Sequence, residues 1–95
     1  MKKYDSGPYA TARIGERLRA TRLAMGLAQQ DFADRAGLGQ SAYNQVETGR
    51  KRPSVDTGLA LCEVYDITLD WIYRGEGSGL PYRLWDELRK HIDPD

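Results

Sequence analysis

The sequence is poor in the residues that build disulfides and metal centres, because it contains one cysteine, Cys62, and one histidine, His91. One cysteine cannot form a disulfide within the chain, and with a single histidine it cannot complete a metal site. Long apolar runs are missing as well, and none approaches the roughly 20 residues that a membrane-spanning helix needs. We therefore expect no bound metal and no membrane-spanning segment.

Signals for secretion and for catalysis are also lacking. The N-terminal stretch MKKYDSGPY has two lysines but no apolar segment behind them, so it does not resemble a secretory signal, and we expect a cytoplasmic protein. The sequence offers no paired nucleophile and base, no cluster of metal ligands and no glycine-rich phosphate loop after a strand. We accordingly predict no enzyme, no cofactor and no small-molecule ligand.

Positive and negative charges balance overall, but they are unevenly distributed. Residues 1–53 hold ten basic and five acidic residues, a balance of +5, whereas residues 54–95 hold four basic and nine acidic residues, a balance of −5. This asymmetry favours a polyanion as the partner of the first half, although surface charges also segregate without function.

Residues that typically start and end helices recur along the chain, while the alternating β-branched runs that are typical of strands are missing. We predict an all-α protein with helices over residues 12–25, 27–36, 40–48, 54–65 and 68–74, and with a sixth over 81–92 behind the linker GEGSG. Ser54 and Thr68 are suitable N-caps for the fourth and fifth of these helices. The predicted organisation is a flexible N-terminal arm over residues 1–11, one domain over 12–76, and a linker with a C-terminal helix over 77–95.

The third of these helices, with the sequence QSAYNQVET, has an uncharged polar face. At about 100° per residue, this face carries amide and hydroxyl groups from Gln40, Ser41, Asn44, Gln45 and Thr48. The other side, expected to pack inward, carries Ala42, Tyr43 and Val46. Amides and hydroxyls match the donor and acceptor pattern of base edges in the major groove of DNA. The composition alone leaves two readings open, a DNA-reading helix and an ordinary surface helix.

The residues on either side of this helix favour the first reading. Two short helices joined by the turn AGLG match the helix-turn-helix arrangement. The first helix of such a pair crosses the phosphate backbone, so Gln29 at its start is expected to offer its amide and its backbone N–H group to a phosphate. Arg50, Lys51 and Arg52 follow the third helix and are expected to neutralise further phosphates.

From Ile14 to Glu76, about two thirds of the chain, the sequence resembles the Cro/repressor-type helix-turn-helix family, which includes lambda repressor. The distinctive stretches are GLAQQDFA, ETGRKRPS and TLDWI. The resemblance implies a compact five-helix, lambda repressor-like DNA-binding domain, here with an additional C-terminal helix. It also implies that Gln29 binds phosphate and that Gln40, Ser41, Asn44 and Gln45 read bases.

The resemblance further implies a structural ion pair between Arg22 and Glu47, and a core to which five side chains contribute: Leu59, Leu61, Leu69, Trp71 and Ile72. The sequence departs from the family pattern at four positions. Ala28 and Gly39 stand where N-capping Ser or Thr is frequent, and Ala is a poor cap. Thr21 stands where Leu is frequent, and Gly58 lies inside a helix at a cost of about 1 kcal/mol relative to Ala.

The C-terminal helix is too apolar to stand alone behind a linker. We predict that its apolar stripe, together with the neighbourhood of the fifth helix, makes the contact of a homodimer, with packing against the same chain as the alternative. The residues of this stripe are Leu84, Trp85, Leu88 and Ile92. Cys62 is expected to be a small buried side chain and His91 a solvated helix end. Lys2, Lys3 and Tyr4 are expected to form a disordered tail, with a contact to DNA as the alternative.

The leading hypothesis from the sequence is a sequence-specific regulator of transcription that binds double-stranded DNA as a dimer, and specifically a repressor of phage or prophage type. The second is a protein-interaction module, antitoxin-like or an anti-regulator, that reuses the fold. The overall neutral charge, the acidic second half and the apolar final helix favour this second class. The missing Arg or Lys on the base-facing side of the third helix favours contacts with A·T pairs over guanine.

Overall fold

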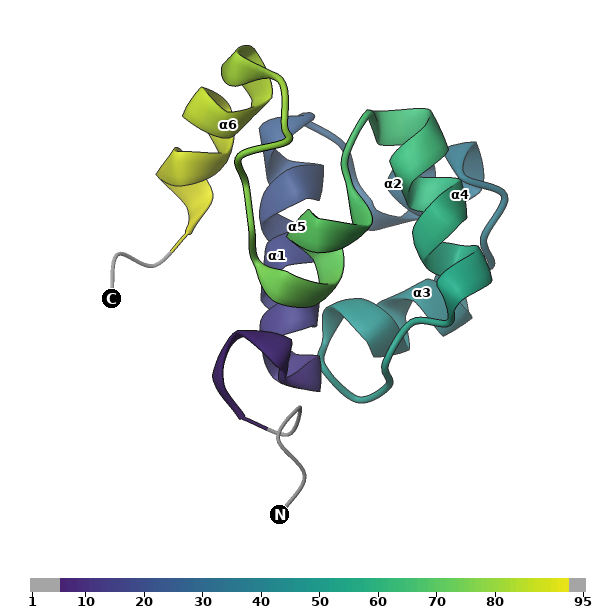
Figure 1. Cartoon of the computed structure of the whole chain (residues 1–95). Coiled ribbons are helices and arrows are strands. Elements are labelled where there is room, and N and C mark those ends of the chain that lie inside the picture. The colour runs from purple at the N-terminus through teal and green to yellow at the C-terminus, as the bar shows by residue number, and fades with distance from the viewer. Residues whose placement is uncertain (1–5, 93–95) are drawn as a thin grey trace.

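The computed structural model describes residues 6–92, which form an all-α fold without a strand in that part of the chain (Figure 1). In chain order the elements are the 3-10 helix η2 (Gly7–Tyr9), α1 (Thr11–Ala24), α2 (Gln29–Arg35), α3 (Gln40–Glu47), α4 (Val55–Tyr65), α5 (Leu69–Arg74), α6 (Tyr82–Leu88) and the 3-10 helix η3 (Arg89–His91). The predicted fold class, five helices and an additional C-terminal one, is confirmed. Within residues 6–92, no helix combines the length and the apolar character needed to cross a membrane.

Local sequence signals set the ends of the later helices. The hydroxyl of Ser54 accepts a hydrogen bond from the backbone N–H of Thr57 at 3.2 Å, and that of Thr68 accepts one from the N–H of Trp71 at 3.0 Å. These are the N-cap contacts expected for α4 and α5. Ala28 and Gly39, which precede α2 and α3, make no side-chain cap bond. These two helices therefore depend on packing for their position.

The core surrounds α1, which contacts α3, α5 and α6. Ile14 and Leu18 of α1 have no exposed surface. Phe32 of α2 stacks on Tyr65 of α4 with ring centroids 4.2 Å apart, and the Tyr65 hydroxyl donates to the Phe32 carbonyl at 2.7 Å. The contacts between Phe32 and Tyr65 tie α2 to α4.

Three of the five predicted core residues, Leu61, Trp71 and Ile72, are buried. The prediction is wrong for Leu59 and Leu69, whose side chains are 49% and 37% exposed. Leu59 of α4 and Leu69 of α5 are only partly covered, although the Leu69 side chain packs close to Gly58 of α4. Their exposure leaves an apolar surface that the sequence did not reveal.

Thr21, the departure from Leu, is a buried hydrogen-bonding centre. Its hydroxyl donates to the carbonyl of Arg17 at 2.8 Å and accepts from the indole N–H of Trp71 at 3.0 Å. A leucine at this position would leave the buried indole donor without its partner, which is costly. The change from the family pattern therefore satisfies Trp71.

The C-terminal helix α6 packs against α1 of the same chain (Figure 1). Leu88 has no exposed surface, and Trp85 meets Trp71 edge to face at a centroid distance of 5.8 Å. The predicted role of Leu88 in a dimer contact is thus corrected, because a fully covered side chain offers no surface to a second copy. Leu84, Trp85 and Ile92 are half-buried and pack against the same core. The helix is also shorter than expected, since residues 89–91 form a 3-10 turn.

The segments on either side of the domain are held by specific contacts. In the predicted flexible arm, Gly7–Tyr9 form a 3-10 helix, and Arg17 donates to the carbonyl of Pro8 at 2.7 Å. In the predicted linker, Leu80 is buried, and Gly77 lies so close to the Trp85 ring that a Cβ there would approach it to 2.6 Å. The predictions for Lys2, Lys3 and Tyr4 fall outside the described residues.

Cys62 and His91, for which the sequence predicted no functional role, lie in α4 and η3. Cys62 is half-buried in α4, and burial raises the pKa of its thiol. His91 is exposed at the end of η3, as expected. Across residues 6–92, no group of three or more His, Cys, Asp or Glu side chains is arranged to hold a metal ion.

Candidate nucleic-acid interface

The turn between α2 and α3 depends on Gly37, which has a φ of 72°. Side chains rarely adopt this left-handed conformation, whereas glycine does so readily. The N–H groups of Gly37 and Leu38 donate to the carbonyls of Asp34 and Ala33 at 3.0 and 2.9 Å, which closes the end of α2. α3 then starts in a new direction and packs against α2 and α1.

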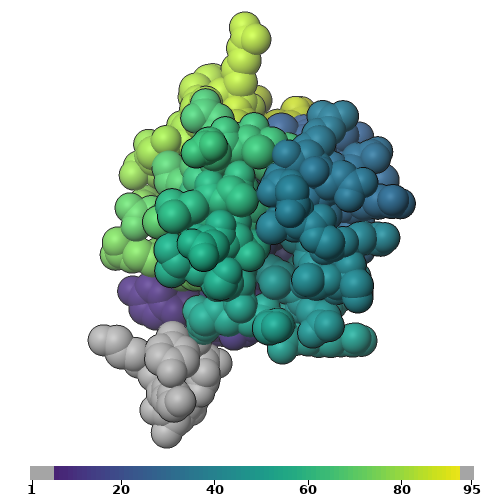
Figure 2. Space-filling view, turned by 90° about the vertical axis from the view of Figure 1, so that its right-hand side faces the viewer, coloured from purple at the N-terminus to yellow at the C-terminus, as the bar shows by residue number. Residues whose placement is uncertain are grey.

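The outward side of α3 carries most of the predicted base-reading residues. Gln40, Ser41 and Gln45 are exposed, and Asn44 is half-buried. Figure 2 shows the face of the molecule on which α2 (blue), α3 (teal) and α4 (green) lie together. On the inner side, Tyr43 and Val46 are buried as predicted, but Ala42 is exposed, which corrects the expectation that it packs inward. The face is therefore polar and free for contact, with a small apolar side chain in it.

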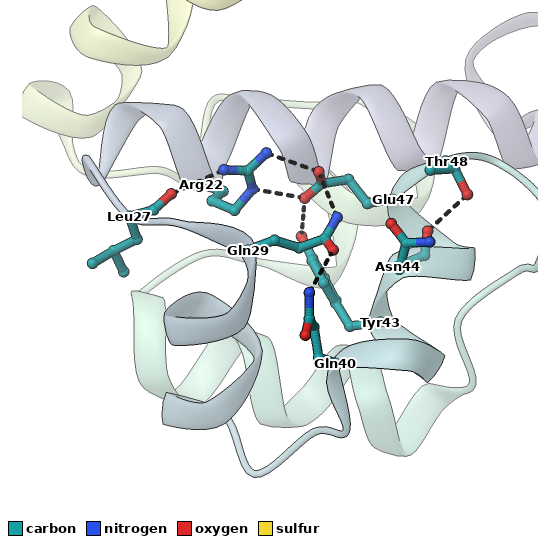
Figure 3. Close-up of polar contacts among 8 residues, drawn as sticks. All are labelled: Arg22, Leu27, Gln29, Gln40, Tyr43, Asn44, Glu47 and Thr48. Atoms are coloured by element: carbon teal, nitrogen blue, oxygen red, sulfur yellow. Dashed lines mark hydrogen bonds and ion pairs between the residues drawn. The ribbon is translucent and has the colours of Figure 1, made fainter.

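The carboxylate of Glu47, at the end of α3, joins three helices (Figure 3). Arg22 of α1 donates to both carboxylate oxygens, with each N···O distance 2.9 Å. The hydroxyl of Tyr43 donates at 2.8 Å and the amide of Gln29 in α2 at 3.2 Å. The structure thus contains the ion pair that the resemblance implied, and adds two neutral donors to it. We call Arg22, Gln29, Tyr43 and Glu47 the Glu47 network.

The ionisation of these groups follows from their contacts. Burial would raise the pKa of Glu47, but the hydrogen bonds from Arg22, Tyr43 and Gln29 outweigh it and hold that pKa below its usual value. The hydrogen bond to Glu47 raises the pKa of Arg22. Burial, together with the nearby carboxylate, raises the pKa of Tyr43, which keeps its hydroxyl protonated as a donor. The Glu47 network is therefore a fixed ion pair at neutral pH.

Gln29, predicted to bind phosphate through its amide, uses both ends of that amide inside the protein. Its nitrogen donates to Glu47, and its oxygen accepts from the amide of Gln40 at 3.4 Å. The side chain therefore links the start of α2 to both ends of α3, as Figure 3 shows. Phosphate contact by the Gln29 amide would require it to give up one of these bonds, whereas its backbone N–H remains at the start of α2.

The basic segment after α3 is fastened to the helix by its backbone. The N–H groups of Arg50 and Lys51 both donate to the carbonyl of Gln45, at 2.9 and 3.1 Å. The side chains of Arg50 and Lys51 are exposed beside the polar face. Arg52 is half-buried, and its guanidinium donates to the carbonyl of Tyr9 at 2.7 Å. Of the three predicted phosphate ligands, Arg52 is thus also a structural link to the N-terminal segment.

Two residues that position α3 were missed by reasoning from sequence. Tyr43 was expected to be an inward residue, but its hydroxyl also completes the Glu47 network. Gly15 lets α1 approach α3, because a Cβ there would lie 2.5 Å from the carbonyl oxygen of Glu47 and 2.7 Å from that of Val46. A glycine in the middle of an otherwise well-formed helix is the only sequence signal for such an approach.

Comparisons with known proteins agree with this geometry. The family model described as helix-turn-helix matches residues 18–72, more than half of the chain. The uncharacterized HTH-type transcriptional regulator YqaE of Bacillus subtilis is 31% identical over 83 residues, which cover 86% of this chain and 70% of that protein. No solved structure matches the chain.

Two further relatives are shorter matches. The uncharacterized HTH-type transcriptional regulator YobD of Bacillus subtilis is 33% identical over 57 residues, 60% of this chain and 51% of that protein. The SPbeta prophage-derived uncharacterized HTH-type transcriptional regulator YonR of the same organism is 31% identical over 62 residues, 65% of this chain and 57% of that protein. The chain thus spans only a little over half the length of these two relatives.

Proposed function

Because the chain belongs to the helix-turn-helix family of DNA-binding transcription regulators, of the Cro/repressor type, we propose that it binds a specific DNA sequence through α3 as a homodimer and represses transcription. One observation carries the proposal: α3 presents an exposed amide and hydroxyl face while its other side is fixed to α1 and α2 by the Glu47 network. A rigid helix with exposed amides is what direct readout in the major groove requires.

Each predicted contact has a defined place in this proposal. Gln40, Ser41, Asn44 and Gln45 read base edges. Arg50 and Lys51 neutralise phosphates next to the groove, and the backbone N–H of Gln29 meets a phosphate at the start of α2. Arg52 takes part only as far as its bond to Tyr9 allows. The similarity to YonR, whose name marks it as prophage-derived, supports a prophage-type regulator.

The dimer surface that we propose keeps the predicted fifth helix but leaves out the stripe of α6, because Leu88 is fully buried and the other stripe residues pack against the core. Val55, Leu59 and Leu69 are exposed apolar side chains, with exposed fractions of 62%, 49% and 37%. They lie on α4 and α5, and Val55 comes shortly after the basic segment. A two-fold axis through this surface would place two α3 helices on the same side of the dimer, where they could read half-sites about 34 Å apart.

The dimer is tested by sedimentation velocity on the whole chain. We expect Leu59→Glu to shift the protein to the monomer, because a charge would be buried at the interface. The matched control is Tyr82→Glu, at a side chain that is 80% exposed on α6, and it should leave the assembly unchanged. Equal behaviour of both variants contradicts the proposed surface.

DNA reading is tested by selecting bound duplexes from a random library. The most enriched duplex is then titrated with the protein by fluorescence anisotropy at several salt concentrations. We expect two half-sites rich in A·T pairs. The double variant Gln40→Ala, Gln45→Ala should bind the selected and the scrambled duplex equally well. Each lost bidentate contact should reduce the difference in binding free energy by about 1–3 kcal/mol. Gln30→Ala, at an exposed amide of α2, is the control and should leave the preference in place.

The phosphate contacts have a separate signature in salt dependence. Arg50→Gln and Lys51→Gln should each flatten the slope of log K against log salt by about one unit. Arg83→Gln and Arg89→Gln, at exposed positions of the C-terminal segment, are matched controls and should not change it. If no sequence is enriched and weak binding ignores all four substitutions, a protein-interaction module of the antitoxin-like or anti-regulator kind becomes the better reading.

A further inference from the structure

A cleft of about 650 Å³ lies on the side of the domain where α6 and η3 approach α1 and the N-terminal turn. Its walls come from η2, α1, α5 and the C-terminal segment. This volume is in the range of clefts that hold small organic molecules, roughly 300–1,000 Å³. The base-reading residues of α3 do not line it. The cleft is therefore a separate feature from the proposed DNA interface.

The wall of the cleft contains a nearly buried guanidinium with a free nitrogen. Arg17 is 9% exposed, and its Nε and Nη2 atoms donate to the carbonyls of Ile72 and Pro8 at 2.7 to 3.1 Å. Its Nη1 atom makes no hydrogen bond within residues 6–92. A Cβ at position 75 would lie 3.1 Å from Nη1, so Gly75 packs against this guanidinium without a side chain of its own.

The charges around the cleft favour an anion. Among residues 6–92, Arg13, Arg17, Arg19 and His91 line it together with one carboxylate, that of Glu16, which pairs with Arg13 at 3.0 Å. Burial, together with Arg13, lowers the pKa of Arg17 to about 10, so this side chain still carries its charge at neutral pH. A buried guanidinium with an open donor forms strong, charge-assisted hydrogen bonds with a carboxylate or phosphate group.

The rest of the lining favours an apolar body on that anion. Trp71 and Trp85 both line the cleft and meet edge to face. Aromatic walls of this kind bind planar apolar groups by offset or edge contacts. Trp71 is fixed by its bond to Thr21, and Trp85 by its packing on Gly77. The cleft thus combines the ring of Trp85, held against the buried Trp71, with three lining arginines.

We propose that this cleft binds a small organic anion, with its carboxylate or phosphate group on the arginines that line the cleft and an aromatic or other planar apolar group against Trp85. A bound molecule would touch α1, α5 and the C-terminal segment at once, and so would hold α6 against the domain.

The test uses the whole chain and three probe anions: benzoate, naphthoate and naphthyl phosphate. The protein has two tryptophans, so NMR spectra contain two indole N–H signals, from Trp71 and Trp85. We expect saturable shifts of both signals with at least one probe below about 1 mM, and binding at least about tenfold weaker for naphthamide, the neutral analogue of naphthoate.

Exposed residues supply variants that keep the fold. Arg13→Gln with Arg19→Gln should weaken binding of the anion by about tenfold, whereas Arg83→Gln with Arg89→Gln, the matched pair outside the cleft, should leave it within about twofold. The proposal is overturned if no probe saturates, if naphthoate and naphthamide bind equally, or if both variant pairs weaken binding alike. The measurement contains no DNA, so its outcome is independent of the proposed reading by α3.

Discussion

Removing the carboxylate of Glu47 is the most informative perturbation of this domain. The side chains of Arg22 and Glu47 are only 13% and 5% exposed, and the carboxylate accepts four hydrogen bonds from three residues. Breaking a buried ion pair by removing one partner costs roughly 3–5 kcal/mol, because the other charge stays behind. Arg22 keeps some access to water, so we expect Glu47→Gln to lower the free energy of unfolding by about 3 kcal/mol.

A double-mutant cycle measured by urea unfolding and circular dichroism separates the pair from the other contacts. We expect a coupling energy above about 1.5 kcal/mol between Arg22→Met and Glu47→Gln. The ion pair between Arg13 and Glu16, with side chains 52% and 61% exposed, is the internal control. Its coupling should stay at about 0.2–1 kcal/mol. A coupling between Arg22 and Glu47 no larger than this control would refute the view that the Glu47 network holds the three helices together.

The same carboxylate predicts a dependence of stability on pH. The pKa of Glu47 is lower in the folded chain than its usual value of 4.5, so protonation favours unfolding. Its contribution is complete above the unfolded value and is lost as the pH falls through the lower folded value. Between about pH 5 and pH 3, Glu47→Gln should therefore lose less stability than the unmodified chain. If the free energy of unfolding falls equally with pH in the two proteins, other carboxylates dominate acid unfolding.

Three further substitutions test close packing and capping, each by urea unfolding. Gly15→Ala should destabilise by about 1–3 kcal/mol, because its methyl group would collide with the carbonyl of Val46, 2.7 Å away; unchanged stability would mean that α1 and α3 can separate freely. Gly58→Ala should bring none of the gain of about 1 kcal/mol expected from helix propensity, because the new Cβ would lie 2.9 Å from the hydroxyl of Tyr73; a full gain would show that this ring moves aside. Ala28→Ser should stabilise by about 0.5–2 kcal/mol, since the N-cap of α2 lacks a side-chain acceptor, and a loss of stability would contradict this.

Features encoded locally could be predicted from the sequence. The helix limits follow from residues within one turn of each end, such as the cap contacts of Ser54 and Thr68. The resemblance supplied the pairing of Arg22 with Glu47, two residues whose contact spans 25 positions. The exposure of Gln40 and Gln45 followed from helical periodicity, because Tyr43 and Val46 mark the opposite side.

Features that depend on the shape of a distant neighbour could not be predicted. Thr21 and Gly58 looked like weak choices, yet Thr21 accepts the indole of Trp71, 50 positions away, and Gly58 makes room for Tyr73. Leu59 and Leu69 looked like core residues, because residue type does not say which side of a helix pair is covered. The stripe on α6 showed that this helix needs cover, but not that α1 and Trp71 provide it.

The packing of α6 against α1 and Trp71 affects where the folding unit of this chain is expected to end. The region that matches the family stops at residue 72, and truncation after Glu76 would look like a natural boundary for a minimal domain. Such a shortened protein would lose Leu88 and the ring of Trp85, and it would uncover the indole of Trp71. Apolar surface released in this way promotes self-association. We therefore expect the autonomous domain to extend at least through Leu88, and a shorter fragment to aggregate whatever its affinity for DNA.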